Sequence, residues 1–139
     1  MPVDIEKYGF VINGLRHITG LECLEILREE GIILDVRPEY ELSQLFDVQR
    51  ILYCPYDEIN EHYQDLPQDG IIIIADAVGL RSKEVAEFLR SKGFARVLHL
   101  SGGIVDWVRD GLPVTLDKTI RLSGSCMCQL KPREKTSKP

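Results

Sequence analysis

The sequence predicts an α/β fold in which helices cover both faces of a mostly parallel central sheet. Short apolar runs, of which the isoleucine run 71–74 is the clearest, alternate with segments of helical periodicity. The runs are apolar throughout, which is typical of strands that are buried on both faces. The chain has 139 residues, of which 44% are hydrophobic and 28% charged. These values are typical of one globular domain with its own core.

The N-terminal part is predicted to hold a strand or hairpin and then a capped helix. Residues 5–12 (IEKYGFVI) indicate the strand or hairpin, with Gly9 as its turn. Thr19 and Glu22 form a capping-box pair, in which each side chain binds the backbone N–H of the other. A helix therefore begins here and runs to about Glu30. Its apolar face is expected to carry Leu21, Leu24 and Leu27.

The middle of the chain is predicted to contain two short strands and two helical segments. Residues 32–36 (IILDV) indicate a short buried strand, and residues 39–46 (EYELSQLF) a helical turn. Residues 50–55 (RILYCP) indicate another short strand that ends at its proline. Residues 56–66 are predicted to form a helix that stops before Pro67.

The second half repeats the strand–helix alternation. The strand at 71–74 is followed by a tight turn and by a helix from about residue 82 to 92, whose core face carries Val85, Phe88 and Leu89. A strand at 96–100 and a short helix at 104–111 complete the alternation, with Trp107 in the core. Beyond Val114 we expect an appended arm with one strand.

The turn after the isoleucine strand is the candidate functional site. Ligands of parallel sheets bind outside the carboxyl ends of the strands. Where such a strand turns into a helix, backbone N–H groups converge on one point and can bind an anion. Asp76 stands first in this turn, where a nucleophile would be expected. The residues expected to bind an anionic substrate are Ala77, Val78, Gly79, Leu80, Arg81 and Ser82.

Several ordered motifs between about His17 and Val114 are similar to those of a known family. ILDVRPEYE is similar to a D-x-R-x-x-x-E-[FY] motif, ADAVGLRS to an active loop C-x-x-G-x-R-S, and LSGGIVDW with GLPV to a closing segment. On these motifs the run resembles the rhodanese domain, the sulfurtransferase fold. The resemblance implies a loop that carries sulfur as a cysteine persulfide.

Two departures from the family pattern bear on the chemistry. The resemblance places the sulfur-carrying cysteine at Asp76, and a carboxylate cannot carry a transferable sulfur. The stretch that usually reads GHIPGA is here LFDVQR, residues 45–50. The number of residues between Asp76 and Arg81 still resembles that in sulfurtransferases. Phosphatases built on this fold have a longer loop.

Three interpretations of Asp76 follow. Its carboxylate imitates the charge of a loaded cysteine, or it acts as a general base, or the domain has lost its nucleophile and kept its fold. Amide donors and a nearby guanidinium would favour the ionised carboxylate and make it a weak base. Arg81 would either hold an anion such as thiosulfate or form an ion pair with Asp76 or Asp35. Asp35 and Arg37 are interpreted as structural support.

The C-terminal arm contains the second candidate group. Cys126 and Cys128 form a C-x-C pair near Lys131 and Arg133, whose charges would stabilise a thiolate. On a flexible arm, either thiol could take over sulfur carriage from the loop. Alternatively, the pair belongs to a metal site completed by other groups, forms a strained redox disulfide, or has no role. The other two cysteines, Cys23 and Cys54, are expected to be small buried residues.

Taken together, the motifs divide the chain into an extension (1–16), a rhodanese-like domain (17–114) and a C-terminal arm (115–139). The net charge of −5 argues against nucleic acid or an acidic membrane surface as the partner. The absence of a long apolar run favours a cytoplasmic location. The expected partner is a small anionic sulfur donor or another protein, and no cofactor or metal is expected. One hypothesis is sulfur transfer through Cys126 or Cys128; the alternative is a non-catalytic binding or regulatory module.

Overall fold

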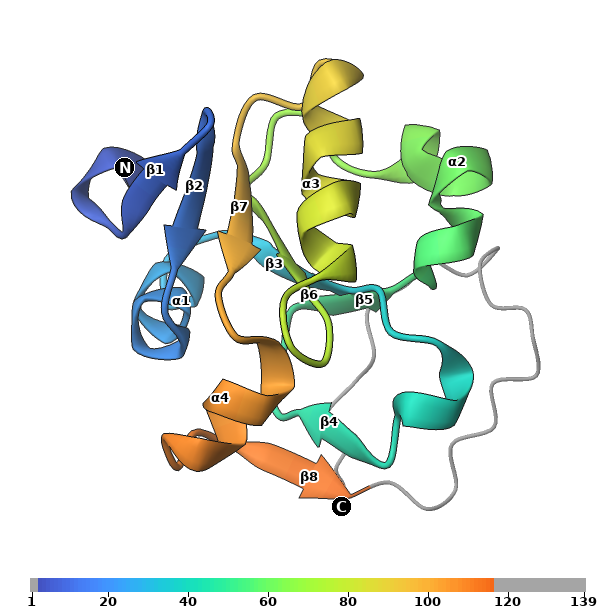
Figure 1. The fold of residues 1–139 in the computed structure, drawn as a ribbon. Coiled ribbons are helices and arrows are strands. Elements are labelled where there is room, and N and C mark those ends of the chain that lie inside the picture. The colour runs from blue at the N-terminus through green and yellow to red at the C-terminus, as the bar shows by residue number, and fades with distance from the viewer. Residues whose placement is uncertain (1–2, 117–139) are drawn as a thin grey trace.

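A six-stranded sheet organises the fold (Figure 1). The computed structural model describes residues 3–116 of the chain. The strands lie in the order β1-β2-β7-β6-β3-β5, and every neighbouring pair is parallel except β1–β2. The predicted mostly parallel sheet is therefore confirmed. Its strands are β1 (Phe10–Ile12), β2 (Leu15–Ile18), β3 (Ile32–Asp35), β5 (Ile51–Tyr53), β6 (Ile72–Ala75) and β7 (Val97–Leu100).

Helices cover both faces of this sheet, as predicted. One core cluster joins two helices to the sheet and includes Ile59, Val85, Ala86 and Leu89. The other cluster joins two further helices to the opposite face and includes Cys23, Ile26, Ile104 and Trp107. The helices are α1 (Gly20–Leu27), α2 (Ile59–His62), α3 (Arg81–Ser91) and α4 (Gly103–Arg109), with short 3-10 turns η1 (Ile5–Lys7), η2 (Glu39–Glu41), η3 (Tyr56–Glu58) and η4 (Tyr63–Asp65).

Strand β6 lies between β3 and β7 and supplies side chains to both core clusters. Ile72 and Ile74 belong to the cluster with α3, whereas Ile73 and Ala75 belong to the cluster with α1 and α4. Successive side chains of a strand point to opposite faces, so a strand covered on both sides is apolar at every position. The isoleucine run is thus explained by its central place in the sheet.

The segment 39–46 differs from the predicted helical turn. Only Glu39–Glu41 are helical, and Gln44–Phe46 form strand β4, which pairs antiparallel with β8 (Val114–Leu116). This small second sheet lies below the main one in Figure 1. Its partner strand comes from the far end of the domain, so no local pattern indicated it.

Two helix predictions need correction. The segment 56–66 is not one helix but η3, α2 and η4 in succession. In α1 the capping box of Thr19 and Glu22 is present. Leu24 and Leu27 of the predicted apolar face pack against the core, but Leu21 is 65% exposed and does not belong to that face. The buried side chains of α1 are those of Cys23 and Ile26. The helix ends at Leu27, three residues earlier than expected.

The N-terminal hairpin turns at a different place from the one predicted. β1 and β2 are joined by Asn13 and Gly14, which both have positive φ, of 51° and 83°. An Asn-Gly pair between two strands is the usual sequence of a tight hairpin turn. Gly9, the predicted turn, precedes β1 instead. Within residues 3–116 the helices are all too short or too polar to cross a membrane.

Candidate functional site

The loop between β6 and α3 is built around the side chain of Asp76. Its Oδ1 accepts a hydrogen bond from Gly79 N–H at 2.5 Å. Its Oδ2 accepts from Arg81 N–H at 2.8 Å and from Ser82 N–H at 3.0 Å. The Ser82 hydroxyl adds a donor to Oδ1 at 3.2 Å. With four donors and only 4% exposure, the carboxylate of Asp76 is enclosed by its own loop.

The predicted anion-binding geometry is therefore present, and its occupant is part of the chain. Arg81 and Ser82 open α3, so their N–H groups have no partner within the helix and carry the positive end of its dipole. The Asp76 carboxylate satisfies both of these groups. Another anion cannot use the same N–H groups while the side chain of Asp76 holds them.

Helix α4 fixes the loop from its other side. Ile104 N–H donates to the carbonyl of Asp76 at 2.9 Å, and Val105 N–H donates to that of Ala77 at 3.0 Å. The close approach requires glycine at position 103, where φ is +58° and an added Cβ would lie 2.4 Å from the Asp76 carbonyl oxygen. The backbone of the loop is thus bonded to the first turn of α4, and its shape does not depend on Asp76 alone.

Two buried histidines lie directly behind the loop. His99 on β7 places Nε2 3.0 Å from the Gly79 carbonyl oxygen and 2.9 Å from Ser82 Oγ. Its Nδ1 lies 2.8 Å from Nδ1 of His17 on β2. Burial is the main cause that lowers the pKa of both imidazoles. The positive charge of Lys83 lowers the pKa of His17 further, and the neighbouring His17 lowers that of His99.

No pattern in the sequence indicated this histidine pair. The two residues are 82 positions apart, and they meet because β2 and β7 are parallel neighbours with His17 opposite His99. To predict this contact, one would have needed to know both that β2 and β7 are adjacent and in which register they pair.

Arg81 contacts Asp76 through its backbone alone. Its guanidinium lies over the ring of Tyr56, with 4.3 Å from Cζ to the ring centroid, a favourable cation–π geometry. Of the two alternatives for Arg81, the ion pair with Asp76 or Asp35 is not formed within the described residues. An open cleft of about 290 Å³ lies beside it, lined by Tyr56, Ile59, Asn60, Arg81, Glu84, Val85 and Phe88.

Asp35 and Arg37 form a buried ion pair at the end of β3. Arg37 Nη2 lies 2.8 Å from Asp35 Oδ2, and Nε lies 3.0 Å from Oδ1. Arg37 also donates to the Glu41 carbonyl at 3.0 Å, while the Tyr53 hydroxyl donates to the carbonyl of Arg37 at 2.8 Å. The pair therefore ties the segment after β3 to η2 and β5, a geometry suited to the supporting role expected of it.

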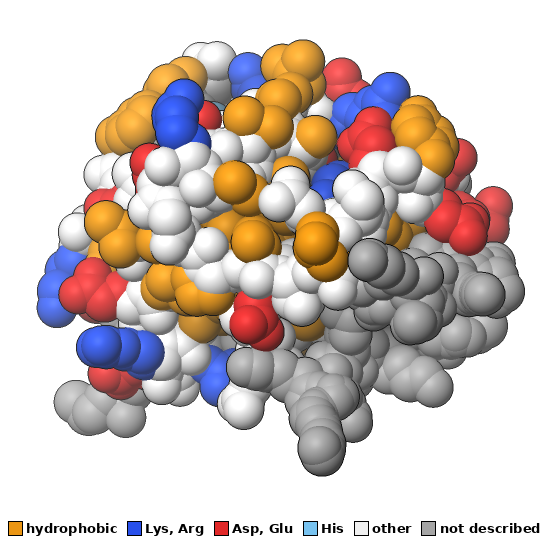
Figure 2. Space-filling model, turned by 90° about the horizontal axis from the view of Figure 1, so that it is seen from below, with side chains coloured by type: hydrophobic (Ala, Val, Ile, Leu, Met, Phe, Trp, Pro, Cys, Tyr) orange, Lys and Arg blue, Asp and Glu red, His pale blue; other side chains and the backbone are white. Residues whose placement is uncertain are grey.

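The outer side of the loop is apolar. Val78 is 53% exposed and Leu80 is 72% exposed. Figure 2 shows the face of the molecule that carries α4, β4 and β8, where hydrophobic side chains gather in the centre and charged ones lie mostly towards the edge. Helix α4 adds the exposed Val105 and Val108. The loop thus turns its polar groups inward and apolar side chains outward.

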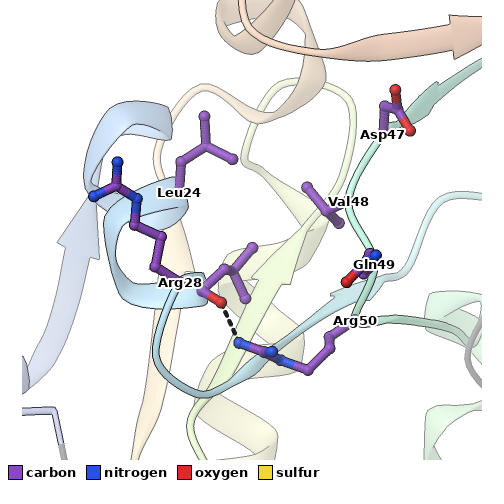
Figure 3. A pocket seen from close by; sticks show the side chains of 7 residues that line it. Leu24, Arg28, Asp47, Val48, Gln49 and Arg50 are labelled. Carbon is purple, nitrogen blue, oxygen red and sulfur yellow. Dashed lines mark hydrogen bonds between the residues drawn. The ribbon is translucent and has the colours of Figure 1, made fainter. Parts of the chain in front are cut away.

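The segment that departs from the GHIPGA pattern lines a separate hollow. Figure 3 shows Leu24 of α1 and Val48 on opposite sides of it, and its volume is about 260 Å³. Arg50 donates to the carbonyls of Leu27 and, at 2.8 Å, of Gly31. The Leu27 carbonyl lies in the last turn of α1 and the Gly31 carbonyl lies beyond it, and neither has a partner within the helix. Arg50 therefore closes the helix end, and the hollow presents no converging reactive groups.

The thiols of the described part are buried, as predicted. Cys23 and Cys54 both have no exposed surface, and burial raises the pKa of the Cys23 thiol far above its ordinary value. Cys126 and Cys128 lie outside the described residues. Within residues 3–116, no group of three or more His, Cys, Asp or Glu side chains is placed to hold a metal ion.

Comparison with known proteins gives consistent matches. A family model described as the rhodanese-like domain matches residues 20–110. A sulfurtransferase of Allochromatium vinosum is 33% identical over 86 residues, covering 62% of this chain and 79% of that protein. A thiosulfate sulfurtransferase of Glaesserella parasuis is 26% identical over 100 residues, covering 71% and 92% respectively. Among solved structures, a rhodanese-related protein from Thermoplasma volcanium superposes with a TM-score of 0.67 at 29% identity, over 73% of this chain and 99% of that one.

Proposed function

Because the chain belongs to the rhodanese-like domain family, we propose that it takes part in sulfur transfer without carrying sulfur on its own 76–82 loop. In this proposal Asp76 stands where the family's sulfur-carrying cysteine would stand. The sulfurtransferases to which this chain is similar support a role linked to sulfur transfer. The substrate would be a small anionic sulfur donor, or a partner protein that brings the sulfur.

The enclosed Asp76 carboxylate is the observation that carries this proposal. A persulfide forms when a thiolate attacks a sulfur atom, and a carboxylate has no comparable nucleophilicity towards sulfur. Nor does Asp76 offer a free lone pair towards solvent, because the N–H groups of Gly79, Arg81 and Ser82 and the Ser82 hydroxyl occupy both carboxylate oxygens. This arrangement also argues against general-base catalysis by Asp76.

The sulfur carrier in this proposal is Cys126 or Cys128. The other two cysteines are buried in the core and cannot meet a donor without unfolding. With thiosulfate as donor, the cysteine thiolate attacks the outer sulfur, the S–S bond of thiosulfate breaks, and sulfite leaves with the bonding electron pair. The product is a cysteine persulfide anion, and no external oxidant or reductant is consumed.

One observation favours a second candidate function, a non-catalytic binding or regulatory module. Val78 and Leu80 expose apolar side chains on the outer side of a loop whose polar groups are already satisfied. A loop of this kind is suited to contact with another protein. In this alternative the fold is kept for recognition, and the two C-terminal thiols are not needed.

The two functions are separated by locating added sulfur. The reduced full-length protein is incubated with thiosulfate and, separately, with a small-molecule persulfide donor, and intact mass with peptide mapping finds each added sulfur atom. We expect sulfur on Cys126 or Cys128, and none in a Cys126→Ser/Cys128→Ser variant. Wild-type protein that gains no sulfur from either donor would contradict sulfur carriage and favour the binding module.

An Asp76→Cys variant in the Cys126→Ser/Cys128→Ser background is the matched control. It places a thiol among the N–H groups of Gly79, Arg81 and Ser82, which stabilise a thiolate or persulfide anion. We expect this variant to gain one sulfur atom at position 76. That gain would show that the donors reach the loop. The lack of added sulfur at Asp76 in the parent would then be due to the carboxylate itself and not to blocked access.

A further inference from the structure

Ser82, His99 and His17 form a continuous hydrogen-bond chain behind the 76–82 loop. Ser82 Oγ lies 2.9 Å from His99 Nε2, and His99 Nδ1 lies 2.8 Å from His17 Nδ1. A serine beside an imidazole that a third side chain orients is also the arrangement of a nucleophilic serine and its general base. The direction of the hydrogen bonds decides whether Ser82 is a nucleophile or a structural donor.

The position of the Gly79 carbonyl indicates which nitrogen of His99 carries the proton. This oxygen lies 3.0 Å from His99 Nε2, and a carbonyl oxygen accepts hydrogen bonds but never donates them. His99 Nε2 therefore carries a proton, and in the neutral ring Nδ1 is then an acceptor. Its partner there is His17 Nδ1, which must be the donor.

The remaining nitrogen of His17 agrees with this direction. His17 Nε2 is buried and, among the described residues, has no hydrogen-bond partner. With its proton on Nδ1, His17 leaves only a lone pair at this position. The opposite tautomer would bury an N–H without an acceptor and would set the lone pair of His99 Nε2 against the Gly79 carbonyl, and both arrangements are unfavourable.

Ser82 is consequently a donor to Asp76 and not a nucleophile. Its hydroxyl oxygen shares the single Nε2–H of His99, at 2.9 Å, with the Gly79 carbonyl, and its proton is donated to Asp76 Oδ1 at 3.2 Å. A general base would need an unprotonated Nε2, which the Gly79 carbonyl disfavours. The side chain of Ser82 is also completely buried, so no substrate reaches it.

We propose that His17 and His99 are positioning residues of the 76–82 loop, linked in the fixed direction His17 to His99 to Ser82 to Asp76. Through this chain β2 and β7 hold the loop carbonyl of Gly79 and the hydroxyl proton of Ser82 in place. The inference rests on the proposed role of the loop as a fixed element that carries no sulfur. Its test needs no sulfur donor, so either proposal can fail without the other.

Nitrogen-15 NMR of the full-length protein at neutral pH tests the direction. Protonated and unprotonated ring nitrogens differ in chemical shift, and a scalar coupling between two nitrogens across an N–H···N hydrogen bond identifies the pair. We expect His17 to be protonated at Nδ1 alone, His99 at Nε2 alone, and a coupling between their Nδ1 atoms. A proton on His99 Nδ1, or the absence of the coupling, would overturn the proposal.

Amide hydrogen exchange tests the positioning role. His17→Leu removes the donor to His99, so we expect exchange at Gly79 and Ser82 to rise about tenfold beyond the rise that global destabilisation produces. Ile33→Val on β3 is the matched control, because it weakens the core without touching the chain. His17→Asn, whose amide nitrogen comes close to the place of Nδ1, is expected to recover most of the loss. Equal exchange at the loop in His17→Leu and in an equally destabilised Ile33→Val would overturn the role.

Discussion

At the scale of single residues, the 76–82 loop is defined by how completely hydrogen-bond donors surround the Asp76 carboxylate. A buried carboxylate is costly unless donors surround it, and here three backbone N–H groups and one hydroxyl do so. The same donors would bind an external anion if the side chain were absent. Asp76 therefore acts as an internal ligand of its own loop, and removing it exposes the site that it fills.

Asp76→Ala is expected to convert the loop into an anion-binding site. The variant leaves the N–H groups of Gly79, Arg81 and Ser82 without their acceptor, so the free energy of unfolding should fall by about 2–3 kcal/mol. Sulfate or thiosulfate should restore part of this loss, in proportion to the logarithm of its concentration. Thermal melts of variant and wild type at constant ionic strength measure the effect. Equal anion dependence in both proteins would contradict the occupied site.

The histidine pair predicts a pH dependence of stability. The pKa values of His17 and His99 are lowered in the folded state, first of all by burial, whereas in the unfolded chain they are near 6.5. Below that pH the unfolded chain binds protons that the folded protein does not, so the contribution is present above about pH 6.5 and is lost as the pH falls towards the lowered folded values.

Urea unfolding between about pH 7 and about pH 5 measures this contribution. The positive charge of Lys83 strengthens the effect, while Glu87 near His17 and Asp76 near His99 oppose it. In a His17→Asn/His99→Gln double variant the slope of the free energy of unfolding against pH should be smaller than in the wild type. The third histidine, His62, is present in both proteins and does not contribute to the difference. An unchanged slope would show that the pair does not titrate in this way.

At the scale of elements, the loop depends on the first turn of α4. Gly103 brings the N–H groups of Ile104 and Val105 against the carbonyls of Asp76 and Ala77. A side chain at position 103 would collide with loop backbone, which cannot move aside as a flexible side chain can. Glycine at position 103 is therefore required by the loop as well as by the first turn of α4.

Gly103→Ala is expected to destabilise the protein far more than Gly111→Ala. Both glycines have positive φ, but an added Cβ at Gly111 meets nothing within 4 Å. The conformational penalty at Gly111 should be about 1–2 kcal/mol, and the collision at Gly103 should add about 2 kcal/mol. Urea unfolding of the two variants gives the difference directly. Similar losses would mean that the loop backbone yields easily at this contact.

At the scale of the whole molecule, parallel strands bring the site together at one edge of the sheet. Asp35 closes β3, Asp76 follows β6, and His99 lies one residue before the end of β7. Because the strands are parallel, their carboxyl ends lie side by side. The buried ion pair of Asp35 on β3 and the histidine chain that ends on β7 therefore belong to the two strands adjacent to β6, and of the two it is the histidine chain that contacts the loop.

The same architecture predicts a gradient of amide hydrogen exchange. β6 is bonded on both edges and has no exposed side chain, whereas β1 is an edge strand whose three side chains are all exposed. Amides of Ile73 and Ile74 should exchange only by global unfolding, and those of β1 by local opening. Exchange rates under native conditions compare the two strands. Comparable protection in β1 and β6 would show that the hairpin unfolds together with the core.

Several patterns within short segments were predicted correctly, although the single helix over 56–66 and the turn at Gly9 were not, and specific pairings across the chain were missed. The isoleucine strand, the capping box of Thr19 and Glu22, and the turn at Asp76 each depend on neighbours in sequence, and each is present. The strand β4 was predicted as a helical turn, because its stability comes from pairing with β8 about seventy residues later. Leu21 was wrongly placed on the buried face of α1 for a similar reason, since the sheet and not the helix decides which side is buried.

The sequence by itself determined the fold family, the order of strands and helices, and the place of a carboxylate in an anion-binding loop. These follow from local hydrophobic patterns, turn residues and ordered motifs. Only the tertiary structure decided that this carboxylate is saturated by its own loop, that Arg81 lies over Tyr56, and that His17 meets His99. The reason is physical: hydrogen-bond saturation and burial depend on which strands are neighbours and in what register, and strand register is a property of the assembled sheet.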